Sequence, residues 1–344
     1  MTLQSTDFTQ SRRQQFLTQI YYQENTALIE KNIKWLETQN WSESKDNNEY
    51  NCQEGRRWFN IAHMTWELLQ LEYTAGKPIE QLADYLEQVI IARENQARAK
   101  AEYFKTDQEA VLGGSGEGYL LPLQLMGLAY LLNRRDLLPR IKTLVEGEGD
   151  MFEEIDDNNY VRLLRYALPK LDFHNVAWND SYANLYNALY EGNTPAEALS
   201  DLTAYLKEWY LLHEGHLWHD SHLDLENNDK YVGYWAFEAA AVVYLLDLDD
   251  SSLHQFLYYP KDLVEYARNQ QPAASPVSNR YTGRTLRVGE TCTSTGWYEA
   301  LLLNNRREHF TTGQVIEGQA ISAHGQPIVW YELTPEAAKE YSHR

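Results

Sequence analysis

Apolar side chains recur three and four positions apart through most of the first 270 residues of this 344-residue chain. This spacing places them on one face of an α-helix. The pattern predicts helices over residues 17–36, 58–71, 78–91, 119–132, 137–145, 160–168, 182–190 and 194–210. Residues 119–132 are almost continuously apolar, which predicts a helix that is buried on all sides.

The breaks between these stretches are short. They read AGKP at 75–78, GGSGEG at 113–118 and EGNTP at 191–195. Thr194 followed by Pro195 is typical of a helix start, with the threonine at the cap and the proline just inside it. Because short connections join antiparallel neighbours, we expect helical hairpins packed in layers.

The character of the chain changes near residue 271. Residues 271–280, QPAASPVSNR, have the composition of a linker. Segments of β type follow at 281–288, 297–303, 314–316 and 328–333, and a short helix is predicted at 335–341. The predicted fold is therefore mainly α, with an all-α domain over 1–270 and a small β-rich subdomain over 281–344.

The formal net charge is −20. This charge repels nucleic acid phosphates and anionic membranes, and it attracts basic partners. One run, EGEGDMFEEIDD at 146–157, has no basic residue, and its carboxylates are Glu146, Glu148, Asp150, Glu153, Glu154, Asp156 and Asp157. Such a run either keeps a helix entrance solvated or forms a docking surface for a basic protein.

Nothing in the sequence predicts a membrane span or a secretory signal, since no apolar run is long enough and the N-terminus is polar. The cysteines Cys52 and Cys292 are far apart, which fits a reducing cytoplasm better than a disulfide scaffold.

Four histidines fall within HEGHLWHDSH, at positions 213, 216, 219 and 222. If this segment were an α-helix, a step of three residues would turn each ring about 60° from the last, so few rings could share one metal ion. A zinc hydrolase would need three or four ligands, for which His213, His216, Glu214 and Asp220 are the candidates. We expect hydrogen bonds here and no ion, with Asp220 holding a ring nitrogen.

Two other motifs do not predict a binding or catalytic site. GGSGEG lacks the lysine and hydroxyl residue of a phosphate-binding loop. Cys292 with His309 has the residue types of a nucleophile and its base, but no further residue supports the pair.

Glu238 lies inside the apolar stretch 236–246. A lone carboxylate in such a place is costly unless it is paired. We therefore expect a buried partner, for which His222, Arg268 and a nearby tyrosine are the candidates. The small residues at 239–241 allow another helix to approach closely.

Three segments together resemble the signature of bacterial immunity proteins of the PoNi type. They read WHDSH at 218–222, GYWAFEAAAVVYLLDLDDSSL at 233–253 and YYPKDLVEYAR at 258–268. The resemblance covers residues 200–270, and the earlier helices are compatible with the family's all-α N-terminal part. GETCTSTGWYEA at 289–300, RREHFTTGQVIEGQ at 306–319 and VWYEL at 329–333 resemble the β extension of related immunity proteins.

Proteins of this type neutralise polymorphic nuclease toxins that contact-dependent machines, such as type VI secretion systems, deliver. The resemblance implies no catalysis and no cofactor. It implies stoichiometric binding of a toxin domain and occlusion of its active site. In this interpretation the signature residues form a buried framework, and they are Asp220, Ser221, His222, Gly233, Tyr234, Trp235, Phe237 and Glu238.

The leading hypothesis is thus a cytoplasmic immunity protein whose partner is a basic toxin domain, with the run 146–157 as its docking surface and the β extension as a competing surface. One alternative is the metal-dependent hydrolase built on the histidine cluster. Another is a helical scaffold for a different basic protein. Close-packed helical faces would also allow a homodimer.

Overall fold

The computed structural model describes residues 5–39, 52–114, 116–153, 157–168, 179–189, 193–227, 230–270, 281–300, 306–320 and 328–339. By its contacts the chain divides into two compact units, Met1–Ile155 with Leu202–Pro272 and Asp156–Asp201 with Ala273–Arg344. The linker expected at 271–280 lies outside the described residues. The domain boundaries expected from the sequence stay a prediction, because a compact unit need not fold alone.

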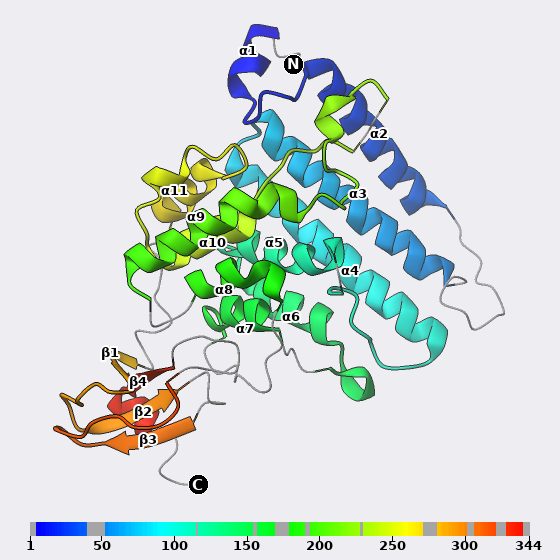
Figure 1. Cartoon of the computed structure of the whole chain (residues 1–344). Coiled ribbons are helices and arrows are strands. Elements are labelled where there is room, and N and C mark those ends of the chain that lie inside the picture. The colour runs from blue at the N-terminus through cyan, green and yellow to red at the C-terminus, as the bar shows by residue number, and fades with distance from the viewer. Residues whose placement is uncertain are drawn as a thin grey trace. The chain divides into compact units, whose positions relative to one another are not determined.

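The first unit is helical (Figure 1). Its helices are α1 (Ser5–Ser11), α2 (Gln19–Thr38), α3 (Gln53–Ala75), α4 (Leu82–Phe104), α5 (Glu117–Leu131), α6 (Leu138–Glu146), the second half of α9 (Pro195–Leu212), α10 (Phe237–Leu245) and α11 (Lys261–Gln270). Single 3-10 turns lie at Ile79–Gln81, Arg135–Leu137, Gly149–Met151, Ser221–Leu223 and Ser251–Leu253.

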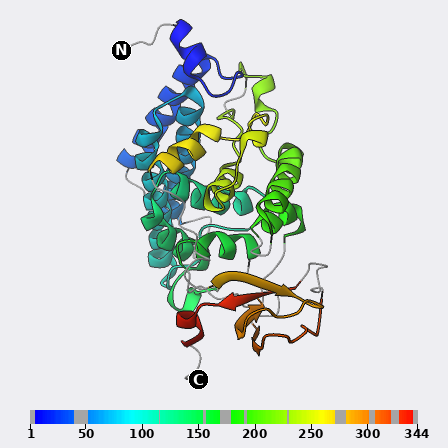
Figure 2. The same ribbon diagram turned by 90° about the vertical axis from the view of Figure 1, so that its left-hand side faces the viewer.

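The long helices α2, α3 and α4 lie side by side, with α3 packed against the other two (Figures 1 and 2). The turn between α3 and α4 begins at Gly76, whose φ of +94° is in the left-handed region. A Cβ atom there would lie 2.1 Å from the carbonyl oxygen of Ser11, so only glycine fits. The predicted break at 75–78 and the helical hairpin around it are confirmed.

Helices α5 and α10 pack against each other inside this unit. Both are apolar around their whole circumference, as the sequence predicted for 119–132 and 236–246. The two backbones come close because α5 carries Gly127, and a Cβ added there would lie 2.8 Å from the carbonyl oxygen of Phe237. The small residues at 239–241 are also buried, and together these positions let the two helices touch.

The second unit holds α7 (Asn158–Arg165), the turn Asp180–Tyr182, α8 (Ala183–Ala188), the start of α9 and the C-terminal sheet with α12 (Pro335–Lys339). Helix α9 begins as predicted. The Thr194 hydroxyl accepts a hydrogen bond from the N–H of Glu197 at 3.2 Å, and the Glu197 carboxylate accepts one from the N–H of Thr194 at 2.7 Å. This reciprocal pair satisfies donors that the first turn leaves open.

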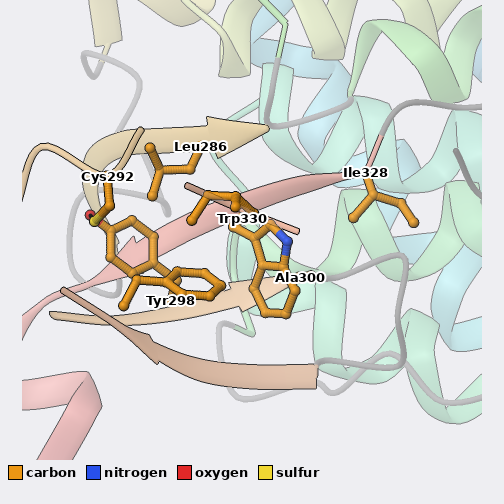
Figure 3. Close-up of a cluster of buried hydrophobic side chains, with 8 residues drawn as sticks. Leu286, Cys292, Tyr298, Ala300, Ile328 and Trp330 are labelled. Carbon is orange, nitrogen blue, oxygen red and sulfur yellow. Dashed lines mark hydrogen bonds between the residues drawn. The ribbon is translucent and has the colours of Figure 1, made fainter. Parts of the chain in front are cut away.

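The sheet has four antiparallel strands in the order β1 (Tyr281–Arg287), β4 (Val329–Leu333), β2 (Gly296–Ala300) and β3 (Arg306–Phe310). One face of the sheet is covered by an apolar cluster, part of which Figure 3 shows: Leu286, Cys292, Tyr298, Ala300, Phe310, Ile316, Ile328 and Trp330. The mainly helical chain with a small β-rich end, as predicted, is confirmed.

Two details of the sheet differ from the sequence-based expectation. The strand expected at 314–316 is wrong, because that segment contributes only an isolated bridge between Thr291 and Val315. Strand β3, RREHF, was not predicted. It lies at the edge of the sheet, where charged side chains are common, so it shows no apolar alternation that would reveal it.

Replacing Gly127 by alanine tests the close approach of α5 and α10. In an exposed helix this change would stabilise the protein by about 1 kcal/mol. Here the added methyl meets backbone atoms of α10, so we expect a net loss of about 1–3 kcal/mol. Urea unfolding measures it, with Gly215→Ala as the control because no atom lies near a Cβ added at that site. A Gly127→Ala variant as stable as the control would contradict the prediction.

Candidate functional site

The segment that follows α9 is a series of three-residue turns. Backbone N–H groups donate to the carbonyl oxygen three residues earlier at Glu214, His216, His219, Ser221 and Leu223, over 2.9–3.1 Å. Helix α9 has ended at Leu212, and Asp220 adopts a left-handed φ of +57°. The α-helical geometry against which the spacing of the histidines was tested therefore does not apply to this segment. In turns of this kind, residues three apart lie on the same side instead of drifting around an axis.

The four histidine rings point into the aromatic interior. The ring of His213 packs on Trp209, and that of His216 packs on His213 at 4.8 Å. The ring of His219 packs on Tyr210 at 4.1 Å, and that of His222 packs on Phe16 at 4.2 Å. The spacing of three residues thus places all four rings on the inner side of the turns, where they pack against aromatic side chains.

His213 is the most enclosed of the four. Its Nδ1 lies 2.6 Å from the carbonyl oxygen of Trp209. Burial lowers the pKa of His213 to about 3, and it also lowers the pKa of His222. Both rings are therefore neutral near pH 7 and act as uncharged aromatic groups.

Among the described residues, no group of three or more histidine, cysteine, aspartate or glutamate side chains is placed to hold a metal ion. The candidate ligands of the hydrolase alternative face different ways, since His213 is buried while Glu214 and Asp220 are exposed. Asp220 does lie beside a histidine ring, with Oδ2 3.6 Å from Nδ1 of His219.

Glu238 lies fully buried at the start of α10. Its Oε1 accepts hydrogen bonds from the Tyr205 hydroxyl at 2.9 Å and from the Trp209 indole at 2.7 Å. Within the described residues its Oε2 has no hydrogen-bond partner. Burial raises the pKa of Glu238 to about 7, so this carboxyl takes up a proton far more readily than an exposed one.

Of the partners expected for Glu238, only the tyrosine is correct. Nδ1 of His222 lies 2.7 Å from the Tyr234 hydroxyl, and Arg268 donates to Asp250 at 2.9 Å. Trp209 was missed, although it lies one helical turn after Tyr205 on α9 and so shares its face.

Residues 233–236, which lead into α10, are held in place by two distant side chains. The Gln14 amide donates to the carbonyl oxygen of Tyr234 at 2.7 Å and accepts from its N–H at 3.0 Å. The Trp235 indole donates to the Thr74 hydroxyl at 2.8 Å. A Cβ at Gly233 would lie 2.1 Å from that same hydroxyl, and φ there is +105°. Neither Gln14 nor Thr74 belongs to a recognisable sequence motif, so these two partners could not be predicted.

The signature residues are mostly interior. Ser221, Gly233, Tyr234, Trp235, Phe237 and Glu238 are buried, and His222 is half-buried. Asp220 is exposed instead, and its Oδ1 accepts from the Tyr210 hydroxyl at 2.7 Å. The structure brings these residues together around Tyr234, whose hydroxyl also accepts from the N–H of His222 at 3.2 Å.

The acidic run is not one uniform surface. Glu146 is buried at the end of α6 and forms an ion pair with Lys142. Asp157 caps α7 by accepting from the N–H groups of Asn159 and Tyr160. Within the described part of the run, the exposed carboxylates are Glu148, Asp150 and Glu153. Glu154 and Asp156 lie outside the described residues.

A cavity of about 90 Å³ opens beside the turn segment. Its walls come from α3, α5 and the turns, and they include Trp66, Glu67, Leu120, Gln124, Leu217 and Trp218. Two indole rings line this recess together with one acidic and one basic side chain, Glu67 and Lys230, which suits the binding of one side chain more than a reaction.

The remaining motifs add no reactive site. Cys292 is buried in the sheet cluster and its thiol donates to the carbonyl oxygen of Ser294 at 3.0 Å. His309 is exposed, while the next residue, Phe310, is buried, so the His309 ring lies on the other face of the strand. None of the described helices is both long and apolar enough to cross a membrane.

Comparisons with known proteins show the family and the fold of the chain. Two sequence models of one family match the chain, the N-terminal part of the PoNe immunity proteins (PoNi) at residues 13–142 and their C-terminal part at 156–263. The fold is similar to the crystal structure of protein PA2201 from Pseudomonas aeruginosa, with a TM-score of 0.58 and 15% identity, over 76% of this chain and 92% of that one. No curated protein sequence matches the chain.

Replacing Glu238 by glutamine is expected to remove a pH dependence of stability. Burial raises the pKa of this carboxyl from 4.5 to about 7, so over this range the folded protein holds a proton that the unfolded chain has lost. The contribution of Glu238 to the free energy of unfolding is therefore complete below pH 4.5 and is lost as the pH rises to about 7. The loss is about 3 kcal/mol, whereas the neutral amide loses nothing.

Urea unfolding of both proteins at about pH 4.5 and about pH 8 measures this difference. The exposed Glu80 on the first unit provides the control, since Glu80→Gln should follow the wild type at both pH values. A Glu238→Gln protein that also followed the wild type would show the prediction to be wrong.

Proposed function

Because the chain belongs to the family of PoNe immunity proteins, PoNi, we propose that it binds a cognate nuclease toxin and neutralises it by covering the toxin's active site. It acts as a stoichiometric inhibitor and not as an enzyme. The observation that carries the proposal is the pair of family matches, which together extend from residue 13 to residue 263.

The charge of the chain supports this partner. A nuclease holds nucleic acid phosphates with basic side chains. A protein with a formal net charge of −20 attracts such a surface, which speeds association and favours basic partners over others. We further propose that the protein acts in the cytoplasm, where a nuclease would meet nucleic acid. A homodimer stays a prediction.

The run 146–157 stays the surface that the sequence proposes for the toxin. Only its exposed carboxylates can meet a partner, because Glu146 is buried in an ion pair and Asp157 is engaged at a helix start. In the described part of the run these are Glu148, Asp150 and Glu153. The β-rich end of the chain is the competing surface.

Mixing the purified protein with the toxin domain encoded beside it tests the function. We expect protection of DNA to become complete at equimolar protein, and co-expression to rescue cells from the toxin. Raising the salt concentration from about 0.05 M to about 0.5 M should weaken the complex severalfold, because ions screen the attraction.

A catalytically dead toxin variant is the control, and it should bind equally well. Protection by a small fraction of an equivalent would instead indicate an enzyme, and stoichiometric zinc, iron or manganese in the purified protein would favour the hydrolase. Failure to bind the toxin or to rescue the cells would refute the proposal.

A further inference from the structure

A row of exposed side chains that begins in the last turn of α9 and continues along the turns after it alternates leucine with a carboxylate. Every third residue is exposed, and these six residues, here called the outer row, are Leu211, Glu214, Leu217, Asp220, Leu223 and Glu226. The exposed fractions of the three leucines are 70%, 74% and 71%. Single exposed leucines are common, but three in one regular row mark a surface that gains by being covered.

The outer row and the histidines lie on opposite sides of the same turns. The histidines at 213, 216, 219 and 222 also recur every third residue, and they pack inward while the outer row faces solvent. Trp218 stacks on Trp209 at 5.6 Å, and His213 packs on both indoles. Because this aromatic base is already ordered, a partner would lose little entropy in fixing the row.

The cavity described above begins at the middle of the outer row, since Leu217 is part of its wall. Trp66 and Trp218 supply aromatic surface, and Glu67 and Lys230 supply one charge of each sign. A recess of about 90 Å³ has room for one side chain. Pockets of this kind, beside exposed apolar residues, are where interfaces place their strongest contacts.

The charge around the row selects its partner. From 211 to 227 the sequence contains no lysine or arginine, while Glu214, Asp220, Asp224 and Glu226 are exposed. A second copy of this chain would place carboxylates against carboxylates, and nucleic acid would place phosphates there. A surface that alternates basic and apolar side chains complements the row in both charge and hydrophobicity.

We propose that the outer row, with the cavity beside Leu217, is the surface that binds the basic toxin domain. The toxin contributes apolar side chains to the three leucines, basic side chains to the carboxylates between them and one side chain to the cavity. This inference rests on the proposed function, and it places the interface away from the run 146–157.

Exchanging single apolar residues tests the leucines. Leu217→Ser should weaken the toxin complex by at least about tenfold, as truncation at the centre of an interface does. Ile20→Ser on α2 is the matched control, because Ile20 is 68% exposed and lies outside the row. Its dissociation constant should stay within about twofold of the wild type. The urea midpoints of both variants show that the fold is intact.

Charge reversal tests the carboxylates. The double variant Glu214→Lys with Glu226→Lys should weaken binding by at least about tenfold at low salt, mainly through slower association. Asp220 is left unchanged because it accepts a hydrogen bond from Tyr210.

The matched control reverses two exposed carboxylates of α2, Glu24→Lys with Glu30→Lys, and should change the dissociation constant by no more than about twofold. Reversal in the acidic run, Glu148→Lys with Glu153→Lys, tests the competing surface and should weaken binding less than reversal in the outer row.

The inference is overturned if Leu217→Ser behaves like Ile20→Ser, or if reversal in the acidic run weakens the complex more than reversal in the outer row. These outcomes leave the proposed function standing, since the wild type still binds. If the wild type does not bind the toxin, the proposed function itself fails and the inference falls with it.

Discussion

A carboxyl group without a countercharge, that of Glu238, determines how α9 and α10 meet. A buried carboxyl must be held by donors, and here Tyr205 and Trp209 supply them from one face of α9. The Trp209 ring then stacks on Trp218 and on Tyr258, at 5.6 Å and 5.0 Å. The turns after α9 rest on this stack, so the position of the outer row follows from the position of one acidic side chain.

The helices of this chain could be predicted from its sequence, because the pattern of buried apolar residues and the local conformation of the end residues indicate the same boundaries. Gly76 ends α3 where its left-handed conformation is needed, and α10 is apolar on every side. The site was harder to predict, because the hydrogen-bond donors to Glu238 come from another helix. The sequence alone does not show which helices pack against each other. The histidines were misjudged for a different reason. Their period of three was read against a helix of 3.6 residues per turn, whereas the chain there turns every three.

The residues that carry the family resemblance lie mostly in the interior. Tyr234, Trp235 and Phe237 are buried, Tyr234 hydrogen-bonds to Gln14 and Trp235 hydrogen-bonds to Thr74, so these residues account for a shared fold. The residues that would meet a toxin are on the outside and are free of those constraints. The outer surface can therefore change in sequence while the interior that defines the fold is kept.

The hydrogen bonds between Gln14 and Tyr234 have a consequence for the timing of folding. They join residues 220 positions apart in the chain. During synthesis Gln14 is exposed to solvent, without its acceptor, until the ribosome has released the segment around Tyr234. Closing so long a loop is slow compared with forming the hairpins in between. A partial chain that ends before Tyr234 therefore leaves Gln14 without these two hydrogen bonds, so the interior of the first unit is completed only after most of the chain has been synthesised.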